Sequence, residues 1–165
     1  MRICEKNLLC EIEFFYFYAK EKKSRMSTIQ EIKQQILDDF AVFDDWMQKY
    51  EYLIDMGKSL EPLDDKYKTD ENLILGCQSR AWVIAEQGPD GRIYYKGDGE
   101  AVISKGMLAL IFRVVNGQKP EDILSEDFGF INDLGLVENL SPTRAYGLES
   151  MIKRVKELAE KFKNK

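Results

Sequence analysis

The chain has 165 residues, of which 44% are hydrophobic and 32% are charged, and its formal net charge at pH 7 is −5. This length fits one domain with a single core, and the composition is that of a globular protein rather than a disordered or membrane-spanning one. The acidic balance excludes a protein that neutralises nucleic-acid phosphates or an anionic membrane surface with many cations. Because the sequence contains no histidine, mechanisms that use imidazole as a base, an acid or a metal ligand are excluded as well.

The first 25 residues differ from the rest of the chain. Their apolar stretch, residues 12–18, is interrupted by a glutamate and is shorter than the roughly 20 residues that a membrane-spanning helix needs. It lacks the small-residue cleavage site of a secretory signal. Met26 precedes a helix-start pattern, so translation can begin there. We therefore expect residues 1–25 to be a dispensable extension that need not be native, and residues 26–165 to form a single domain.

Two amphipathic helices are expected at the start of this domain. Ser27 or Thr28 can cap the first helix, with Gln30 and Glu31 in capping-box positions. Asp44 or Asp45 can start the second helix, and Gly57 marks its end. Apolar residues follow at helical spacing, in the first helix Ile29, Ile32, Ile36, Phe40 and Phe43, and in the second Trp46, Tyr50, Leu53 and Ile54. A polar connection, residues 61–72, is expected as a surface loop.

A β-hairpin is expected in the middle of the chain. Residues 81–87 alternate as in a strand, Gly88-Pro89-Asp90-Gly91 is a strong turn signal, and residues 92–96 can return as the antiparallel partner. We interpret Gly97-Asp98-Gly99 as a turn into the next helix, over residues 101–115, which is apolar apart from Lys105 and Arg113.

The last third of the chain is expected to be helical again. Residues 120–124 favour a short helix, and residues 128–140 favour a loop with a short helical turn. A long final helix begins with Ser141 as cap and Pro142 at its first position. It is expected to bury Ala145, Leu148, Ile152, Val155, Ala159 and Phe162. Helices, a hairpin and more helices predict an α+β fold with a small antiparallel sheet flanked by helices.

Cys77 is the most informative residue, because it lies in a small polar corner, Gly76 to Ser79, between two apolar runs. The other cysteines, Cys4 and Cys10, do not complete an even disulfide framework, so we expect reduced thiols in the cytoplasm. A thiol of ordinary pKa, about 8.5, is only a few per cent thiolate at neutral pH, and thiolate is the form that attacks. Backbone N–H groups, a helix amino terminus, Arg80 or a more distant cation could assist it. The alternative is a buried core cysteine.

Spacing excludes several other cysteine sites. A phosphate-binding Cys-x5-Arg loop would need arginine where Val83 stands, and no second cysteine is spaced for dithiol chemistry. Zinc and iron–sulfur sites use three or four ligands, and one cysteine of the expected domain cannot supply them. We therefore expect no metal ligands.

Arg144 is the second candidate residue. It falls in the first turn of the final helix, where the helix dipole disfavours a positive charge by about 0.3–1 kcal/mol. A residue that breaks a local rule is a candidate for function. The alternative is an ion pair between Arg144 and one of the many surface carboxylates.

The segment Gly76-Cys77-Gln78-Ser79-Arg80-Ala81-Trp82 resembles the Gly-Cys-Gln-Ser-x-x-Trp signature of the SufE family, sulfur-acceptor proteins that work with a cysteine desulfurase in iron–sulfur cluster assembly. The resemblance extends from about Ser27 to the end of the chain. It includes Gly97-Asp98 and, in a second block, Leu140 to Arg144 leading to Gly147. The Arg80-Ala81 pair departs from the neutral and β-branched pair that is more typical of the signature.

The resemblance implies that Cys77 takes sulfane sulfur from a persulfide on the desulfurase. It implies supporting or partner-binding roles for Gly76, Gln78, Ser79 and Arg144, with Arg144 beside the acceptor loop or at the partner surface. It also implies an architecture like that of the iron–sulfur scaffold proteins.

The resemblance implies three partners in all: a SufS-like cysteine desulfurase, a downstream iron–sulfur scaffold and, as an open alternative, a second copy of the chain. Pyridoxal phosphate belongs to the desulfurase, so this chain is expected to carry no cofactor, and to meet neither nucleic acid nor membrane. We expect a mobile loop that holds Cys77 against apolar neighbours such as Leu75 or Trp82 and swings out on docking.

Two other functions stay open at this point. A non-catalytic adaptor would bind and regulate a desulfurase without touching sulfur, so the chain need not be an enzyme in its own right. A cysteine hydrolase would need a general base that the sequence does not supply.

Overall fold

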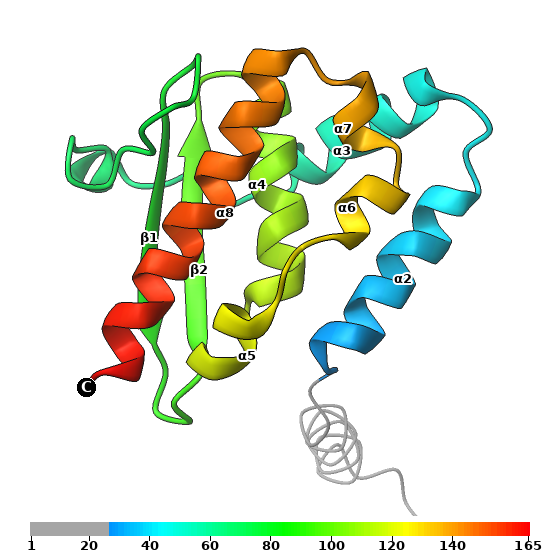
Figure 1. Ribbon diagram of the computed structural model, residues 1–165. Coiled ribbons are helices and arrows are strands. Elements are labelled where there is room, and N and C mark those ends of the chain that lie inside the picture. Colours follow the sequence, from blue (N-terminus) through cyan, green and yellow to red (C-terminus); the bar gives the residue numbers. More distant parts are fainter. Residues whose placement is uncertain (1–26) are drawn as a thin grey trace, which may run out of the picture.

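The computed structural model describes residues 27–165 (Figure 1). The expected extension, residues 1–25, lies outside the described residues. The centre of the fold is helix α4 (Val102–Val115), which packs against a two-stranded sheet on one side and against α2 and α3 on the other. Helix α8 (Pro142–Lys163) crosses the hairpin as a long cover. The expected α+β class, with a small antiparallel sheet and flanking helices, is confirmed.

Both amino-terminal helices begin at the predicted caps. Helix α2 (Ile29–Ala41) has a complete capping box, in which Thr28 and Glu31 each accept the other's backbone N–H. Helix α3 (Trp46–Lys58) is capped by Asp45, whose carboxylate accepts the Gln48 N–H at 2.9 Å. These side chains satisfy N–H groups that a helix start leaves without intrahelical partners.

The hairpin pairs β1 (Ala81–Gln87) with β2 (Ile93–Gly99) in antiparallel register, with Ala81 opposite Gly99. The predicted turn at Gly97-Asp98-Gly99 is therefore wrong, because these residues continue the second strand to its end. Gly97 is needed there for space: a Cβ atom would lie 2.7 Å from the Trp82 carbonyl oxygen and 2.9 Å from the Phe112 ring. A glycine pair that looks like a turn signal thus marks the close approach of α4 to the sheet.

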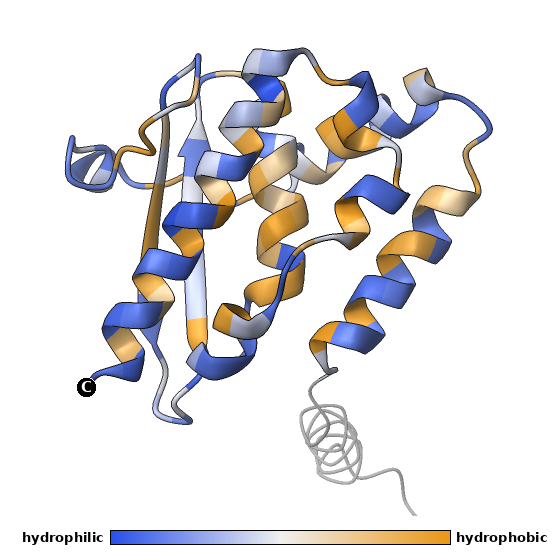
Figure 2. Ribbon diagram, viewed as in Figure 1, coloured by the Kyte–Doolittle hydropathy of each residue, from blue (hydrophilic) through white to orange (hydrophobic). Residues whose placement is uncertain are grey.

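Helix α4 is buried along almost its whole length, and Figure 2 shows it as predominantly hydrophobic. Its contact with α3 is close because glycines meet there. A Cβ atom on Gly57 would lie 2.5 Å from the backbone nitrogen of Gly106, and a Cβ atom on Gly106 would collide with the Leu53 carbonyl. The crossing leaves no room for side chains at these two positions. This close contact fixes the position of α4 and of the residues at its amino terminus.

The remaining segments contain more short helices than expected. The polar connection includes a 3₁₀ turn, Asp65–Tyr67, and residues 128–140 form two short helices, α6 (Phe130–Asp133) and α7 (Leu136–Asn139). Helix α5 (Pro120–Ser125) confirms the expected short helix. Short helices interrupted by glycine have too few turns to show a helical repeat in the sequence.

Helix α8 begins at Pro142 as predicted, although the Ser141 side chain makes no capping hydrogen bond. Of the six residues expected to be buried, Leu148, Val155 and Ala159 are buried fully, and the other three partly. The hydroxyl of Tyr95 on β2 donates to the Val155 carbonyl at 2.9 Å and fastens the helix to the sheet. Within residues 27–165, no helix is both long and apolar enough to cross a membrane.

Candidate functional site

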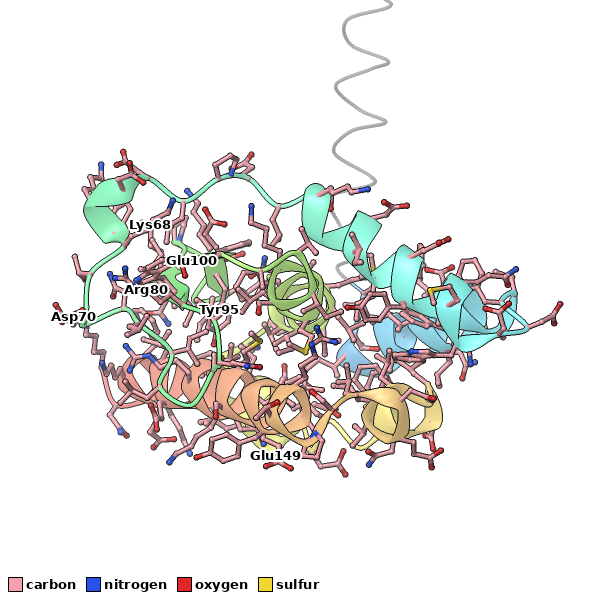
Figure 3. The ribbon with its side chains drawn as sticks, turned by 90° about the horizontal axis from the view of Figure 1, so that it is seen from above. Lys68, Asp70, Arg80, Tyr95, Glu100 and Glu149 are labelled. Carbon is pink, nitrogen blue, oxygen red and sulfur yellow. The ribbon has the colours of Figure 1, made fainter. Side chains whose placement is uncertain are left out.

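The Cys77 loop, residues 75–80, is fixed at both ends by backbone hydrogen bonds. At its start, the Ile74 N–H donates to the Ala81 carbonyl at 2.8 Å, next to a short bridge between Leu73 and Trp82 on β1. At its end, the Arg80 carbonyl accepts the Glu100 N–H at 2.9 Å. The loop is therefore a narrow turn anchored on the hairpin, and it reaches across to α8 (Figure 3).

Cys77 is half-buried and faces the first turns of α8. Its thiol can donate a weak hydrogen bond to the Gly147 carbonyl, at a sulfur–oxygen distance of 3.7 Å. Gly147 carries no side chain, and a Cβ atom at that position would lie 3.6 Å from the sulfur. That distance is an ordinary van der Waals contact, so the thiol packs directly against α8 at Gly147. In residues 27–165, Cys77 is the only cysteine.

A cavity of about 230 Å³ opens beside the thiol. Loop 75–80, α4 and α8 all contribute to its wall. The lining residues are Cys77, Gln78, Ser79, Ala101, Ile103, Ser104, Met107, Thr143, Arg144 and Gly147. Four of the five predicted site residues therefore meet at one cavity, although Arg144 lies far from the loop in the sequence. The fifth, Gly76, lies on the other side of the loop, against Tyr146 and Ser150.

The apolar neighbours of Cys77 are not those expected. Leu75 is 79% exposed and shields nothing, while Trp82 is buried but does not line the cavity. The apolar wall comes instead from Ala101, Ile103 and Met107 at the start of α4. The prediction of Leu75 or Trp82 as the shield is wrong, because the loop turns Leu75 outward and the indole of Trp82 packs beside the cations of Lys68 and Arg80.

Arg80 does not assist the thiol. Its guanidinium lies 5.1 Å from the centroid of the Trp82 ring and 4.0 Å from the Glu100 carboxylate. It belongs to a charged cluster at the base of the loop, in which Asp98 pairs with Lys68 and Lys105, each at 3.3 Å. Figure 3 shows Lys68, Arg80 and Glu100 gathered on this side of the molecule. The cluster fixes the end of the Cys77 loop to the hairpin.

Arg144 lies in the first turn of α8 and is exposed at the rim of the cavity. Among residues 27–165, no carboxylate lies within ion-pair distance of its guanidinium. The surface ion pair that was the alternative explanation for Arg144 is therefore not formed within the described part of the chain. Its guanidinium is therefore unpaired among these residues, at the rim of the cavity that Cys77 also lines.

The pKa of the Cys77 thiol is raised by desolvation, because burial disfavours the charged thiolate. Of the groups that could assist the thiol, no cation lowers its pKa in this conformation. The resting site thus stores Cys77 as a neutral thiol rather than as a reactive thiolate, and reactivity requires that the sulfur gain access to water or to a partner.

We expect the alkylation rate of Cys77 by iodoacetamide to rise with pH along a curve whose midpoint lies above about 8.5, the ordinary cysteine pKa. The measurement uses a Cys4→Ser, Cys10→Ser background, so that Cys77 is the only thiol. The same protein in denaturant should titrate at the ordinary value. The Cys77 thiol ionises at a lower pH in the unfolded chain than in the folded chain. Its contribution to the free energy of unfolding is therefore fully present below the unfolded pKa, and it is lost as the pH rises from the unfolded pKa through the folded pKa. A folded midpoint below the denatured one would contradict this.

Ser104 is a site residue that the sequence reasoning missed. It is buried in α4, and its hydroxyl lies 2.9 Å from that of Ser79 in the loop. Ser104 is the one neutral polar residue of a segment that is otherwise apolar apart from Lys105 and Arg113, a signal that could have identified it. The hydrogen bond holds the loop against α4 while Cys77 faces the cavity.

Ser104→Ala should make Cys77 react with iodoacetamide about 2- to 10-fold faster in the single-thiol background, since a typical hydrogen bond contributes about 0.5–1.5 kcal/mol. Ser125→Ala is the matched control, because that exposed hydroxyl bonds only to the Asp122 carbonyl within its own helix. Equal alkylation rates for the two variants would show that the Ser79–Ser104 contact does not restrain the loop.

The fold and site define an α+β protein that presents one half-buried thiol on an anchored loop. Three comparisons with known proteins agree with this class. The model of the family described as "SufE: Fe-S metabolism associated domain" matches residues 34–159. The chain belongs to the SufE family, as its signature predicts. Membership implies a role in sulfur transfer together with a cysteine desulfurase.

Two similar relatives are uncharacterized SufE-like proteins. That of Rhizobium etli is 38% identical over 130 residues, which cover 76% of this chain and 88% of the relative. That of Rhizobium meliloti is 35% identical over 130 residues, covering 76% and 93%. The solution structure of a hypothetical protein from Thermus thermophilus is similar in fold, with a TM-score of 0.68 at 21% identity, over 81% of this chain and 97% of that one.

Proposed function

We propose that this chain accepts sulfane sulfur from the persulfide of a cysteine desulfurase onto Cys77 and passes it on for iron–sulfur cluster assembly. The observation that carries the proposal is the position of Cys77, a half-buried thiol at a cavity with room for an additional sulfur atom. Family membership supports the general role in sulfur transfer.

The proposed reaction is an exchange at sulfur. The Cys77 thiolate attacks the outer sulfur of the donor persulfide, and a new bond forms between Cys77 Sγ and that sulfur. The sulfur–sulfur bond of the donor breaks, and the donor cysteine leaves as a thiolate with the electron pair. The proton that Cys77 loses is returned to the donor thiolate through solvent. No net oxidation or reduction occurs, so neither an external oxidant nor a histidine is needed.

The raised pKa of Cys77 links this chemistry to movement of the loop. A thiol that is desolvated in its resting position reacts slowly, and the same burial keeps a stored persulfide from reductants and oxidants. We therefore propose that residues 75–80 swing outward on docking, with Gly76 as hinge. Native-state hydrogen exchange should be faster at residues 73–80 than in α4, and equal protection of the two segments would count against the swing.

The other predicted residues receive roles consistent with their positions. Gln78 and Ser79 line the cavity with polar atoms, and Ser79 is also held by Ser104. The Arg144 guanidinium lies beside the space that an anionic persulfide would enter and would stabilise its charge. Gly76 sets the backbone direction that turns Cys77 toward α8.

The remaining parts of the proposal concern the cellular setting. The pyridoxal phosphate of the reaction belongs to the desulfurase, and an iron–sulfur scaffold receives the sulfur. Among residues 27–165, no group of three or more His, Cys, Asp and Glu side chains is arranged to hold a metal ion, so we assign cluster assembly to the scaffold. The odd number of cysteines supports a reduced, cytoplasmic setting.

The experiment is intact mass spectrometry of the purified chain after incubation with a cysteine desulfurase and free cysteine. The expected product has gained the mass of one sulfur atom, released by a reductant, and peptide mapping places it on Cys77. A folded chain that gains no sulfur from an active desulfurase, or gains it only on Cys4 or Cys10, would overturn the proposal.

A further inference from the structure

Two large apolar side chains stand exposed beside Cys77. Leu75, two positions before it, is 79% exposed, and Tyr146, on α8, is 60% exposed. They are neighbours across Gly76, since a Cβ atom on Gly76 would lie 2.8 Å from Cε1 of the Tyr146 ring. Both line one groove at the outer side of the loop, and Tyr146 also lines a depression that includes Cys77. We call Leu75 and Tyr146 the apolar rim.

Leu75 and Tyr146 are exposed apolar members of a groove that also contains charged residues such as Glu149 and Lys153. One exposed apolar residue is ordinary on any protein surface. Here an aliphatic and an aromatic side chain flank a reactive group, and Arg144, at the cavity on the other side of the loop, has no carboxylate partner among the described residues. Tyrosine and arginine are enriched at interface centres, where burial of their large surfaces contributes much of the affinity.

We propose that the apolar rim is the docking anchor for the cysteine desulfurase, which would present an apolar recess to Leu75 and Tyr146 and a carboxylate to Arg144. This inference rests on the proposed function, because direct transfer requires the donor sulfur to touch Cys77. A protein that reaches Cys77 must cover the depression that Tyr146 lines. Charge complementarity assigns the carboxylate, since the Arg144 charge is unpaired within the described chain.

A second copy of this chain fits the rim less well. A symmetric dimer through Leu75 and Tyr146 would cover both Cys77 loops and exclude the donor from them. The apolar rim would then be buried in the state in which Cys77 must be accessible to the donor. Self-association through the rim is therefore an outcome that would overturn the inference.

The test measures the dissociation constant between the chain and the purified desulfurase of the same organism by titration calorimetry. Leu75→Ala and Tyr146→Ala should each weaken binding about tenfold, because each removes apolar area that the complex buries. The chain offers matched controls at the corner between α2 and α3: Val42 is 72% exposed and Met47 is 61% exposed. Val42→Ala and Met47→Ala should change the dissociation constant less than about twofold.

Each outcome decides the inference. Unchanged binding by both rim variants, equal losses in the rim and control variants, or no binding by the wild-type chain would overturn it. So would sedimentation showing a dimer that Leu75→Ala dissociates. Thermal melts check that the variants fold. Failure of the proposed function is distinguishable, because in that case the rim variants still weaken binding while the wild-type chain gains no sulfur on Cys77.

Discussion

Cys77→Ser should abolish sulfur acceptance and remove the stimulation of the desulfurase, a loss of at least about 100-fold in the amount of sulfur transferred, as expected when the nucleophile of a covalent step is removed. A serine hydroxyl has nearly the volume of a thiol, yet it cannot form a bond to sulfane sulfur under these conditions. Cys77 is half-buried and its single hydrogen bond, to Gly147, is weak, so the fold should remain. The measurement is sulfide release by the desulfurase, combined with the intact mass of the acceptor.

The same variant separates an acceptor from an adaptor. An adaptor stimulates by binding alone, so Cys77→Ser would keep its effect if the chain never carried sulfur. The control is the Cys4→Ser, Cys10→Ser double variant, which retains Cys77 and should transfer sulfur as the wild type does. Binding of Cys77→Ser to the desulfurase should stay within about twofold, since the apolar rim is intact. Full stimulation by Cys77→Ser would exclude the acceptor mechanism and favour the adaptor.

Much of the site could be predicted from short sequence patterns. The polar corner around Cys77 lies between two apolar runs, and the loop does fall between a bridge and a strand. Arg144 breaks a local rule at the start of α8, and it does line the same cavity as the thiol. In both cases the signal is local. The positions of glycine, proline and charged residues within one helix turn can be read from the sequence without any knowledge of distant contacts.

What could not be predicted depends on contacts between distant segments. Ser104 stands out in its apolar segment, but its hydrogen bond to Ser79 depends on the packing of α4 against the loop, and the contact of Gly147 with Cys77 depends on the packing of α8. The pKa of Cys77 is raised because the groups packed around the thiol together exclude water from it. Gly97 resembles a turn residue in the sequence because glycine permits turns as readily as close packing, and only its neighbours in the fold, the Trp82 carbonyl and the Phe112 ring, decide between the two.

At Gly76, both the backbone conformation and the limited space disfavour a residue with a side chain. Its φ of +98° lies in the region that residues with a side chain rarely adopt. A Cβ atom there would also lie 2.5 Å from the Ser150 hydroxyl and 2.8 Å from the Tyr146 ring. Gly76→Ala should therefore destabilise the fold by about 1–2 kcal/mol from positive φ, with a smaller addition because the Ser150 hydroxyl and the exposed Tyr146 ring must move aside.

Movement of the loop away from α8 would relieve part of this strain and carry Cys77 out of its place against Gly147. In the single-thiol background we expect Gly76→Ala to alkylate faster than the parent, with an alkylation midpoint closer to the ordinary cysteine pKa as water reaches the sulfur. Gly91→Ala is the matched control, because Gly91 also has positive φ, +77°, but a Cβ atom there would meet nothing within 4 Å. Gly91→Ala should cost about 1–2 kcal/mol in urea denaturation from φ alone and leave Cys77 reactivity unchanged. If the two variants react alike, packing of the loop against Tyr146 and Ser150 does not hold Cys77 in its resting position.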